Sequence, residues 1–204
     1  SMTTTKDKVF STSDTEIALP DGYAFFKDGS LLGFLNPKVS VGVNVLLGKP
    51  GQSYFNLKDQ NGNPVTIQLS TASTKLSPVW ASDGTLEALS VSVDATASVV
   101  ELTTDTNLYN EAYLLDLDQK LSLSLLDRIR SALRASQKYN ADFLELGKKI
   151  RIKDPVRFEK MPTEWKDMLP ELRLTLSVNG TLNRTYSITD PANMNGGGVG
   201  NAET

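Results

Sequence analysis

Hydrophobic and polar residues alternate along most of the first half of the chain. The two longest runs in which apolar side chains recur at every second position are Val39–Leu47 and Leu89–Val99. A period of two residues is the spacing of a β-strand with one apolar face. We therefore predict a strand in each segment. The second is longer than a usual strand, so we expect a bend or bulge inside it.

Three pairs of shorter apolar runs flank turn sequences and predict β-hairpins. The pairs are Tyr23–Phe26 with Leu31–Leu35, Tyr54–Lys58 with Val65–Leu69, and Leu172–Val178 with Leu182–Ile188. The turns of the second and third pairs are Asn61-Gly62 and Asn179-Gly180, and both residue types tolerate a positive φ. The third pair is thus a C-terminal hairpin, which could complete the first sheet.

The spacing of apolar residues becomes helical after residue 119. The positions are Leu126, Ile129, Leu133, Phe143, Leu146 and Ile150. They predict one long helix over about 124–152, bent near Asn140 or Gly147, with a strand at Ile150–Ile152 as the competing interpretation. Pro155 is expected to end this element. A short helix is predicted at about 162–169, with a proline near its start and another past its end.

Strands followed by helices and then strands predict an α+β fold with an antiparallel β-sheet. A length of 204 residues suits one domain, which we place at residues 15–190, with a sub-boundary considered near 104–112. Residues 1–14 and the Gly/Asn-rich residues 191–204 have too little apolar surface to offset the entropy of ordering. We expect both ends to be flexible.

Composition removes several classes of function. The chain contains no Cys and no His, which excludes thiol nucleophiles, imidazole acid–base catalysis and Cys or His metal sites. It also has no Ser-x-x-Lys or Gly-x-Ser-x-Gly motif. No apolar run is long enough for a membrane helix. We therefore expect a soluble chain that is not an enzyme and that has no catalytic residue, cofactor or metal.

Two groups of oxygen-bearing side chains are candidates for metal sites. Asp59, Asn61 and Asn63 alternate as in a calcium loop, but Pro64 and Ser70 stand where an EF-hand needs Gly and Glu. A hairpin turn is the favoured interpretation. Asp116 and Asp118 would share a face if their segment were a strand, and such a pair can serve acid–base or metal chemistry. A solvated pair before a helix is favoured instead.

Charge divides the chain unevenly. Residues 1–118 hold seven Lys, no Arg and fourteen acids, a net charge of −7, whereas residues 119–204 carry +4. Arg130, Arg134 and Lys138 lie four residues apart and share one face of the predicted helix. Together with Arg128 they are our candidate partner-binding residues. A solvated helix face is the alternative.

The order of several motifs resembles a known family. The segment Asn140–Arg151, with the sequence NADFLELGKKIR, is followed by Lys153-Asp154-Pro155, Trp165, Leu169-Pro170 and Arg184-Thr185. This order resembles the C-terminal domain of the lipoprotein C-subunits of bacterial spore germinant receptors. Ala24–Leu35 looks like the start of that domain, so the resemblance covers about residues 23–188. Phe158 and Tyr186 depart from the family pattern, where Trp and Gly are expected.

The resemblance implies a non-enzymatic receptor subunit that acts through protein–protein contacts with other receptor subunits. It also implies a lipid anchor at the spore inner membrane, attached to an N-terminal Cys upstream of this chain. Ser1 before Met2 is expected to be a cloning remnant. No catalytic residue is carried over from the family.

The alternative from a different class is a single-stranded nucleic-acid-binding module. It would use the basic 128–160 region with aromatic residues such as Phe158. The net charge of −3 argues against nucleic acid as the partner.

Overall fold

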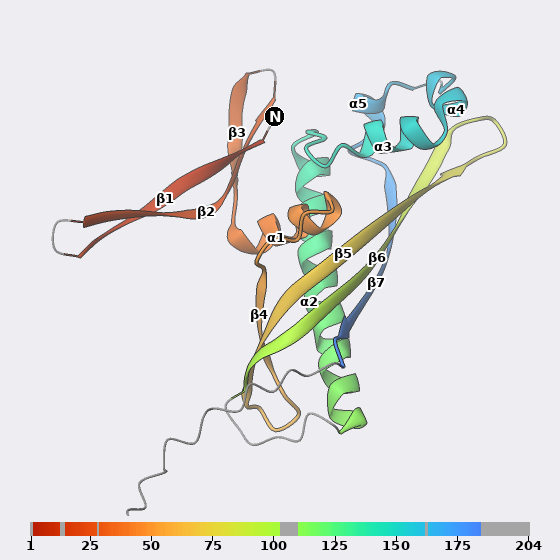
Figure 1. The fold of residues 1–204 in the computed structure, drawn as a ribbon. Helices are drawn as coiled ribbons and strands as arrows, with labels where there is room; N and C mark the ends of the chain where they lie inside the picture. Colours follow the sequence, from red (N-terminus) through yellow and green to blue (C-terminus); the bar gives the residue numbers. More distant parts are fainter. Residues whose placement is uncertain (1, 13–14, 28, 103–109, 162, 185–204) are drawn as a thin grey trace, which may run out of the picture.

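The computed structural model describes residues 2–12, 15–27, 29–102, 110–161 and 163–184. Its strands and helices are largely segregated into runs along the chain, as in an α+β fold (Figure 1). In chain order they are β1 (Met2–Thr12), β2 (Thr15–Lys27), β3 (Ser30–Leu35), α1 (Pro37–Leu46), β4 (Tyr54–Lys58), β5 (Pro64–Trp80), β6 (Leu86–Leu102), α2 (Glu111–Lys138), α3 (Leu146–Lys153), α4 (Pro155–Glu159), α5 (Trp165–Met168) and β7 (Arg173–Leu182).

The strands form two sheets. One has the order β1-β2-β3 and is antiparallel throughout, and the other has the order β4-β5-β6-β7. Strands β4, β5 and β6 pair antiparallel, whereas β7 runs parallel to β6. The predicted α+β class is confirmed. The larger sheet is mixed, because the helices α2 to α5 connect β6 to β7 and this long connection allows the two strands to run parallel.

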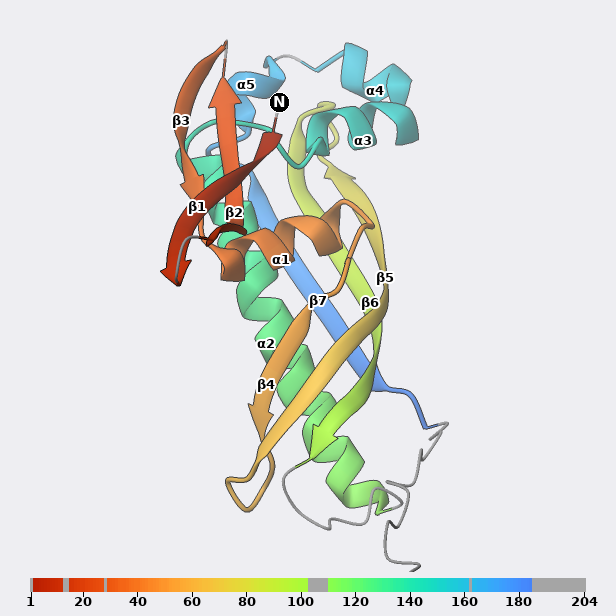
Figure 2. The same cartoon turned by 60° about the vertical axis from the view of Figure 1, so that its left-hand side comes forward.

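Helix α2 supplies the central apolar stripe of the core. Its side chains at every fourth position are almost completely buried, namely Leu117, Leu121, Leu125, Ile129 and Leu133. They belong to one cluster with the inward side chains of the four-stranded sheet, such as Ile67, Leu89 and Val91. Complete burial of each such side chain stabilises the fold by about 1.5–3 kcal/mol. In both views α2 runs beside β7, and α1 crosses α2 (Figures 1 and 2).

Two of the three predicted hairpins are confirmed. Strands β2 and β3 pair on either side of Gly29, which has a φ of 80°. Strands β4 and β5 pair around Asn61-Gly62, and Gly62 has a φ of 85°. The Asp59 carboxylate accepts hydrogen bonds from the N–H groups of Asn61 and Asn63, so its oxygens stabilise the turn. This segment is therefore a hairpin turn, as predicted.

The bulges expected in the long strand are present. The pairing of β6 with β5 shifts register at three places, one of which lies within the predicted strand, where Ser70 of β5 has no opposing residue beside Thr96 and Ala97. Bulges of this kind increase strand twist. They allow β5 and β6, 17 residues each, to curve around the helices (Figure 2).

The strand predicted at Val39–Leu47 is wrong, because this segment forms helix α1. Asn36 caps the helix by accepting the N–H of Val39, and Pro37 occupies its first turn. The alternation of apolar residues wrongly predicts a strand, because α1 is buried on most of its circumference and therefore shows no helical period. The buried positions include Ser40 and Gly42. Gly42 lets α1 cross α2 closely, since a Cβ atom there would lie 2.2 Å from the carbonyl oxygen of Arg128.

The single long helix predicted over 124–152 is also wrong. Helix α2 begins thirteen residues earlier, at Glu111, where the Asn110 side chain accepts the N–H of Tyr113. It ends at Lys138, and α3 starts only at Leu146. The expected bend is a complete break, because Asn140 and Glu145 adopt left-handed φ values of 46° and 56°. The competing strand at 150–152 is wrong as well, since these residues lie in α3.

The proline-rich region after α3 contains two short helices. Pro155 does end α3, but it also begins α4, whose N-terminus is capped by Asp154. The short helix predicted at about 162–169 is confirmed as α5, which covers only Trp165–Met168.

The predicted C-terminal hairpin is wrong. Asn179-Gly180 does not turn, because β7 continues through both residues to Leu182 in register with β6. Gly180 is needed there for space, since a Cβ atom would lie 2.9 Å from Cγ of Leu121 on α2. The returning strand expected at 182–188 falls largely outside the described residues.

The ends of the chain were expected to be flexible. Most of the N-terminal segment forms β1, which pairs with β2. Its flexibility stays a prediction. Residues 191–204 and most of the sub-boundary considered near 104–112 lie outside the described residues.

We expect Gly42→Ala to lower the free energy of unfolding by about 2 kcal/mol or more, because the new methyl group forces the backbones of α1 and α2 apart. The gain in helix propensity, about 1 kcal/mol, does not offset this strain. Urea denaturation followed by circular dichroism measures the difference. Gly33→Ala is the matched control, because its Cβ would meet only ring atoms of Phe25, at 3.3 Å, and should cost less than about 1 kcal/mol. Equal losses in the two variants would contradict the close crossing.

Candidate partner-binding face

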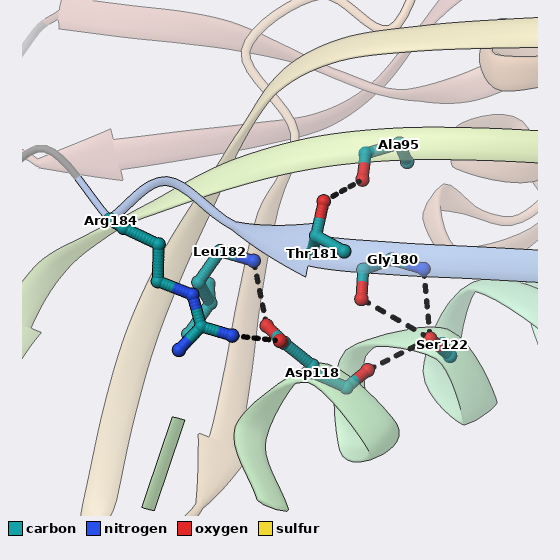
Figure 3. A network of polar contacts seen from close by, with 7 residues as sticks. All are labelled: Ala95, Asp118, Ser122, Gly180, Thr181, Leu182 and Arg184. Carbon is teal, nitrogen blue, oxygen red and sulfur yellow. Dashed lines mark hydrogen bonds and ion pairs between the residues drawn. The ribbon is translucent and has the colours of Figure 1, made fainter. Parts of the chain in front are cut away.

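Polar side chains of α2 form hydrogen bonds with the C-terminal end of β7. The Asp118 carboxylate accepts the Leu182 N–H at 2.7 Å and pairs with the Arg184 guanidinium at 3.0 Å (Figure 3). One turn later, Ser122 Oγ accepts the Gly180 N–H at 2.8 Å. These bonds satisfy backbone groups on the edge of β7 that faces away from β6.

A second attachment lies at the N-terminal end of the strand. The Gln137 amide donates hydrogen bonds to the carbonyl oxygens of Leu169 and Leu172, just before β7 begins. Gln137 therefore holds the segment that leads into β7, and Asp118 holds the last residue of the strand. Between these two attachments the strand and the helix border an open groove.

Two of the four candidate basic residues line this groove. It has a volume of about 290 Å³ and is bounded by Arg130, Leu133, Arg134, Gln137, Leu174 and Leu176. Arg130 and Arg134 are exposed, and neither forms an ion pair with any residue in the described part of the chain. The lining thus combines three leucine residues with two arginines that have no ion-pair partner in the described residues. We call it the α2–β7 groove.

The other two candidates lie apart from the groove lining. Lys138, exposed at the end of α2, lies 5.3 Å from the ring centre of Tyr139. Arg128 is half-buried, and its guanidinium lies 4.0 Å from the ring centre of Phe55 on β4. Burial lowers the pKa of Arg128 below its usual value, and the neighbouring Asp127 carboxylate opposes that shift. Arg128 therefore contributes to packing between α2 and β4.

The two carboxylates considered for metal or acid–base chemistry do not share a face. Asp116 and Asp118 lie two residues apart within α2, not in a strand or ahead of a helix. Asp116 pairs with Lys120 at 2.7 Å, whereas Asp118 is buried against β7. Across the described residues there is no cluster of three or more acidic side chains that would suit a metal ion.

The segment between α2 and α3 is organised around Asp142. Its carboxylate accepts the N–H groups of Leu146 and Gly147 at the start of α3 and the indole N–H of Trp165 at 2.9 Å. Gly147 packs directly beneath that indole, where a Cβ atom would lie 2.7 Å from Nε1. The spacing of Asp142, Gly147 and Trp165 is thus a structural requirement for joining α3 to α5.

This segment also lies inside a family match that covers most of the chain. The sequence model described as spore germination B3/GerAC-like, C-terminal, matches residues 21–186. The chain belongs to this family. The resemblance to the germinant-receptor C-subunits, drawn from the order of Asn140–Arg151, Trp165 and Arg184-Thr185, is confirmed.

The fold recurs in a solved structure. The crystal structure of the GerBC protein matches with a TM-score of 0.69 and 21% sequence identity. The match covers 81% of this chain and 52% of GerBC, so the present chain corresponds to about half the length of that protein. The comparison with curated protein sequences gives no significant match.

Family membership sets the biological context at a coarse level. The family is one of spore germination and of germinant-receptor subunits. Among the described residues, no helix is both long enough and apolar enough to span a bilayer.

We expect Asp118→Ala to lower the free energy of unfolding by about 2–3 kcal/mol, because the buried N–H of Leu182 loses its acceptor. Asp116→Ala is a matched control on the same helix, since it removes only a partly exposed pair with Lys120 and should cost about 0.5 kcal/mol or less. Chemical denaturation of the two variants gives both values. Equal effects would show that the attachment of β7 to α2 does not depend on Asp118.

Proposed function

We propose that this domain is a non-catalytic part of a spore germinant receptor and acts by binding another receptor subunit through Arg130, Arg134 and Lys138. The observation that supports this most directly is the α2–β7 groove, where two guanidinium groups have no ion-pair partner in the described residues. Many other exposed charges of the domain are paired, for example Arg151 with Glu159 and Arg173 with Glu87.

The geometry favours a protein partner with an acidic surface. Arg130, Arg134 and Lys138 follow one another at intervals of four residues and are all exposed. Unpaired charges of one sign steer the approach and orientation of a partner of opposite charge. Leu174 and Leu176 supply apolar surface beside the two arginines, as protein interfaces combine apolar contact with charged borders.

Two of the described carboxylates have structural roles, which supports a role without catalysis. Asp118 and Asp142 are held by backbone and side-chain donors of their own domain, so each serves the fold. Attachment of the parent protein to the spore inner membrane through a lipid is part of the proposal, and it would hold this domain beside the other subunits.

The nucleic-acid alternative has less support from the geometry. It combines the basic helix with the aromatic Phe158, but Phe158 packs against Trp165 with ring centres 6.2 Å apart. Together they border a separate hollow of mixed charge, which includes Arg151, Glu159 and Glu164. Stacking aromatics and the α2 basic residues therefore do not border one common groove.

Reversing the charge of the groove tests the proposal. Spores that carry Arg130→Glu and Arg134→Glu in the C subunit are expected to germinate about tenfold more slowly or worse, because the acidic partner surface is then repelled. The measurement is the loss of optical density after germinant addition, with the subunit level in spores checked by immunoblot.

The matched control reverses two exposed lysines on the four-stranded sheet, Lys58→Glu and Lys75→Glu. It changes the net charge equally but leaves the groove intact, so germination should be close to normal. Wild-type germination of the Arg130/Arg134 double variant at a normal subunit level would refute the proposal.

A further inference from the structure

The α2–β7 groove lies along an open edge of the larger sheet. Strand β7 is the last strand in the order β4-β5-β6-β7, so only one of its two edges is paired. Unpaired edges expose rows of N–H and C=O groups that can pair with another extended chain. Only alternate residues of β7 direct their backbone groups toward that edge.

Hydrogen bonds from α2 identify them. The N–H groups of Gly180 and Leu182 bond to Ser122 and Asp118, so they point away from β6, whereas the Asn183 N–H points toward β6 and bonds to Ala97. Backbone groups of residues two apart in a strand face the same side.

The pairing of β7 with β6 continues without a register shift from Arg173 to Leu182. Leu174, Leu176 and Val178 therefore present their N–H and C=O groups to the open edge. In the described part of the chain, these three residues have no hydrogen-bond partner on that side.

The open edge and the unpaired arginines occur at the same place. Leu174 and Leu176 line the groove together with Arg130 and Arg134. On either side the edge is closed by helix side chains, by Gln137 before the strand and by Ser122 and Asp118 at its end. The exposed part of the edge is thus short, and positive charge borders it.

Resting on the proposed function, we propose that this edge accepts an extended acidic segment of the partner subunit as an added β-strand. Its backbone pairs with Leu174, Leu176 and Val178, and its carboxylates meet Arg130 and Arg134. Backbone pairing of this kind supplies affinity, while the arginines select the sequence through charge complementarity.

Amide exchange on the ¹⁵N-labelled chain tests the pairing directly. The probes are a synthetic heptapeptide of alternating Asp with Thr or Val and its counterpart with every Asp replaced by Asn. We expect the acidic peptide to slow exchange at Leu174, Leu176 and Val178 at least tenfold, and the Asn peptide to bind about tenfold more weakly. Arg130→Glu with Arg134→Glu should abolish this preference. Unchanged exchange at the three amides, or equal affinity for the two peptides, would overturn the inference.

Two variants at one position separate strand addition from other contacts. Leu176→Ala and Leu176→Pro both remove the leucine side chain, but only proline removes the N–H that faces the open edge. The alanine variant measures the effect of losing the side chain alone, and the proline variant should bind the peptide at least tenfold more weakly than the alanine variant. Equal binding by both would overturn strand addition. Free glutamate producing the same changes as the peptide would also overturn it, in favour of a small-anion site.

Germination distinguishes failure of this inference from failure of the proposed function. If the Arg130/Arg134 double variant slows germination but spores with Leu176→Pro behave like those with Leu176→Ala, the groove binds its partner without strand addition. If the double variant germinates normally, the proposed function itself fails. If both the double variant and the proline variant are impaired, both proposals are supported.

Discussion

The close attachment of β7 to α2 is the contact on which the rest of the structure depends. Near the C-terminal end of β7 lies Gly180, whose missing side chain lets the strand lie against Leu121. Asp118 and Ser122 then hold the backbone of the strand, and Gln137 holds its start. Because β7 also pairs with β6, the same strand fixes the long helix to the sheet, and the buried stripe of α2 completes the core.

The same arrangement leaves part of the edge of β7 uncovered, and this part is the binding surface that we propose. Helix side chains cover both ends of the open edge of β7, and the middle stays accessible beside Arg130 and Arg134. Edge strands are usually protected against unwanted pairing. Here the protection is partial and positively charged, which suits selective pairing with an acidic segment. Arg128 is only two residues before Arg130, yet it lies over Phe55 because helical geometry turns it toward the sheet.

Within the region that matches the family, the Asn140–Arg151 segment serves the fold. Asp142 accepts the first two N–H groups of α3 and the indole N–H of Trp165, and Gly147 leaves room for that indole. The resemblance to the family rests on these residues, but their contacts are internal to the domain. The residues proposed for function lie on another surface, which is consistent with family motifs that preserve a fold while partner surfaces vary.

Local sequence determined the α+β class, the hairpins at Gly29 and Asn61-Gly62, the bulged long strand and the basic face of α2. Turn glycines and side-chain periodicity act within a few residues, so they can be read directly. Tertiary structure decided the rest. Val39–Leu47 became a helix because burial on most sides hides the helical period, and Asn179-Gly180 stayed extended because β7 pairs with a strand that precedes it by more than 80 residues. The groove has the same origin, since Arg134 and Leu174 meet only when the chain is folded.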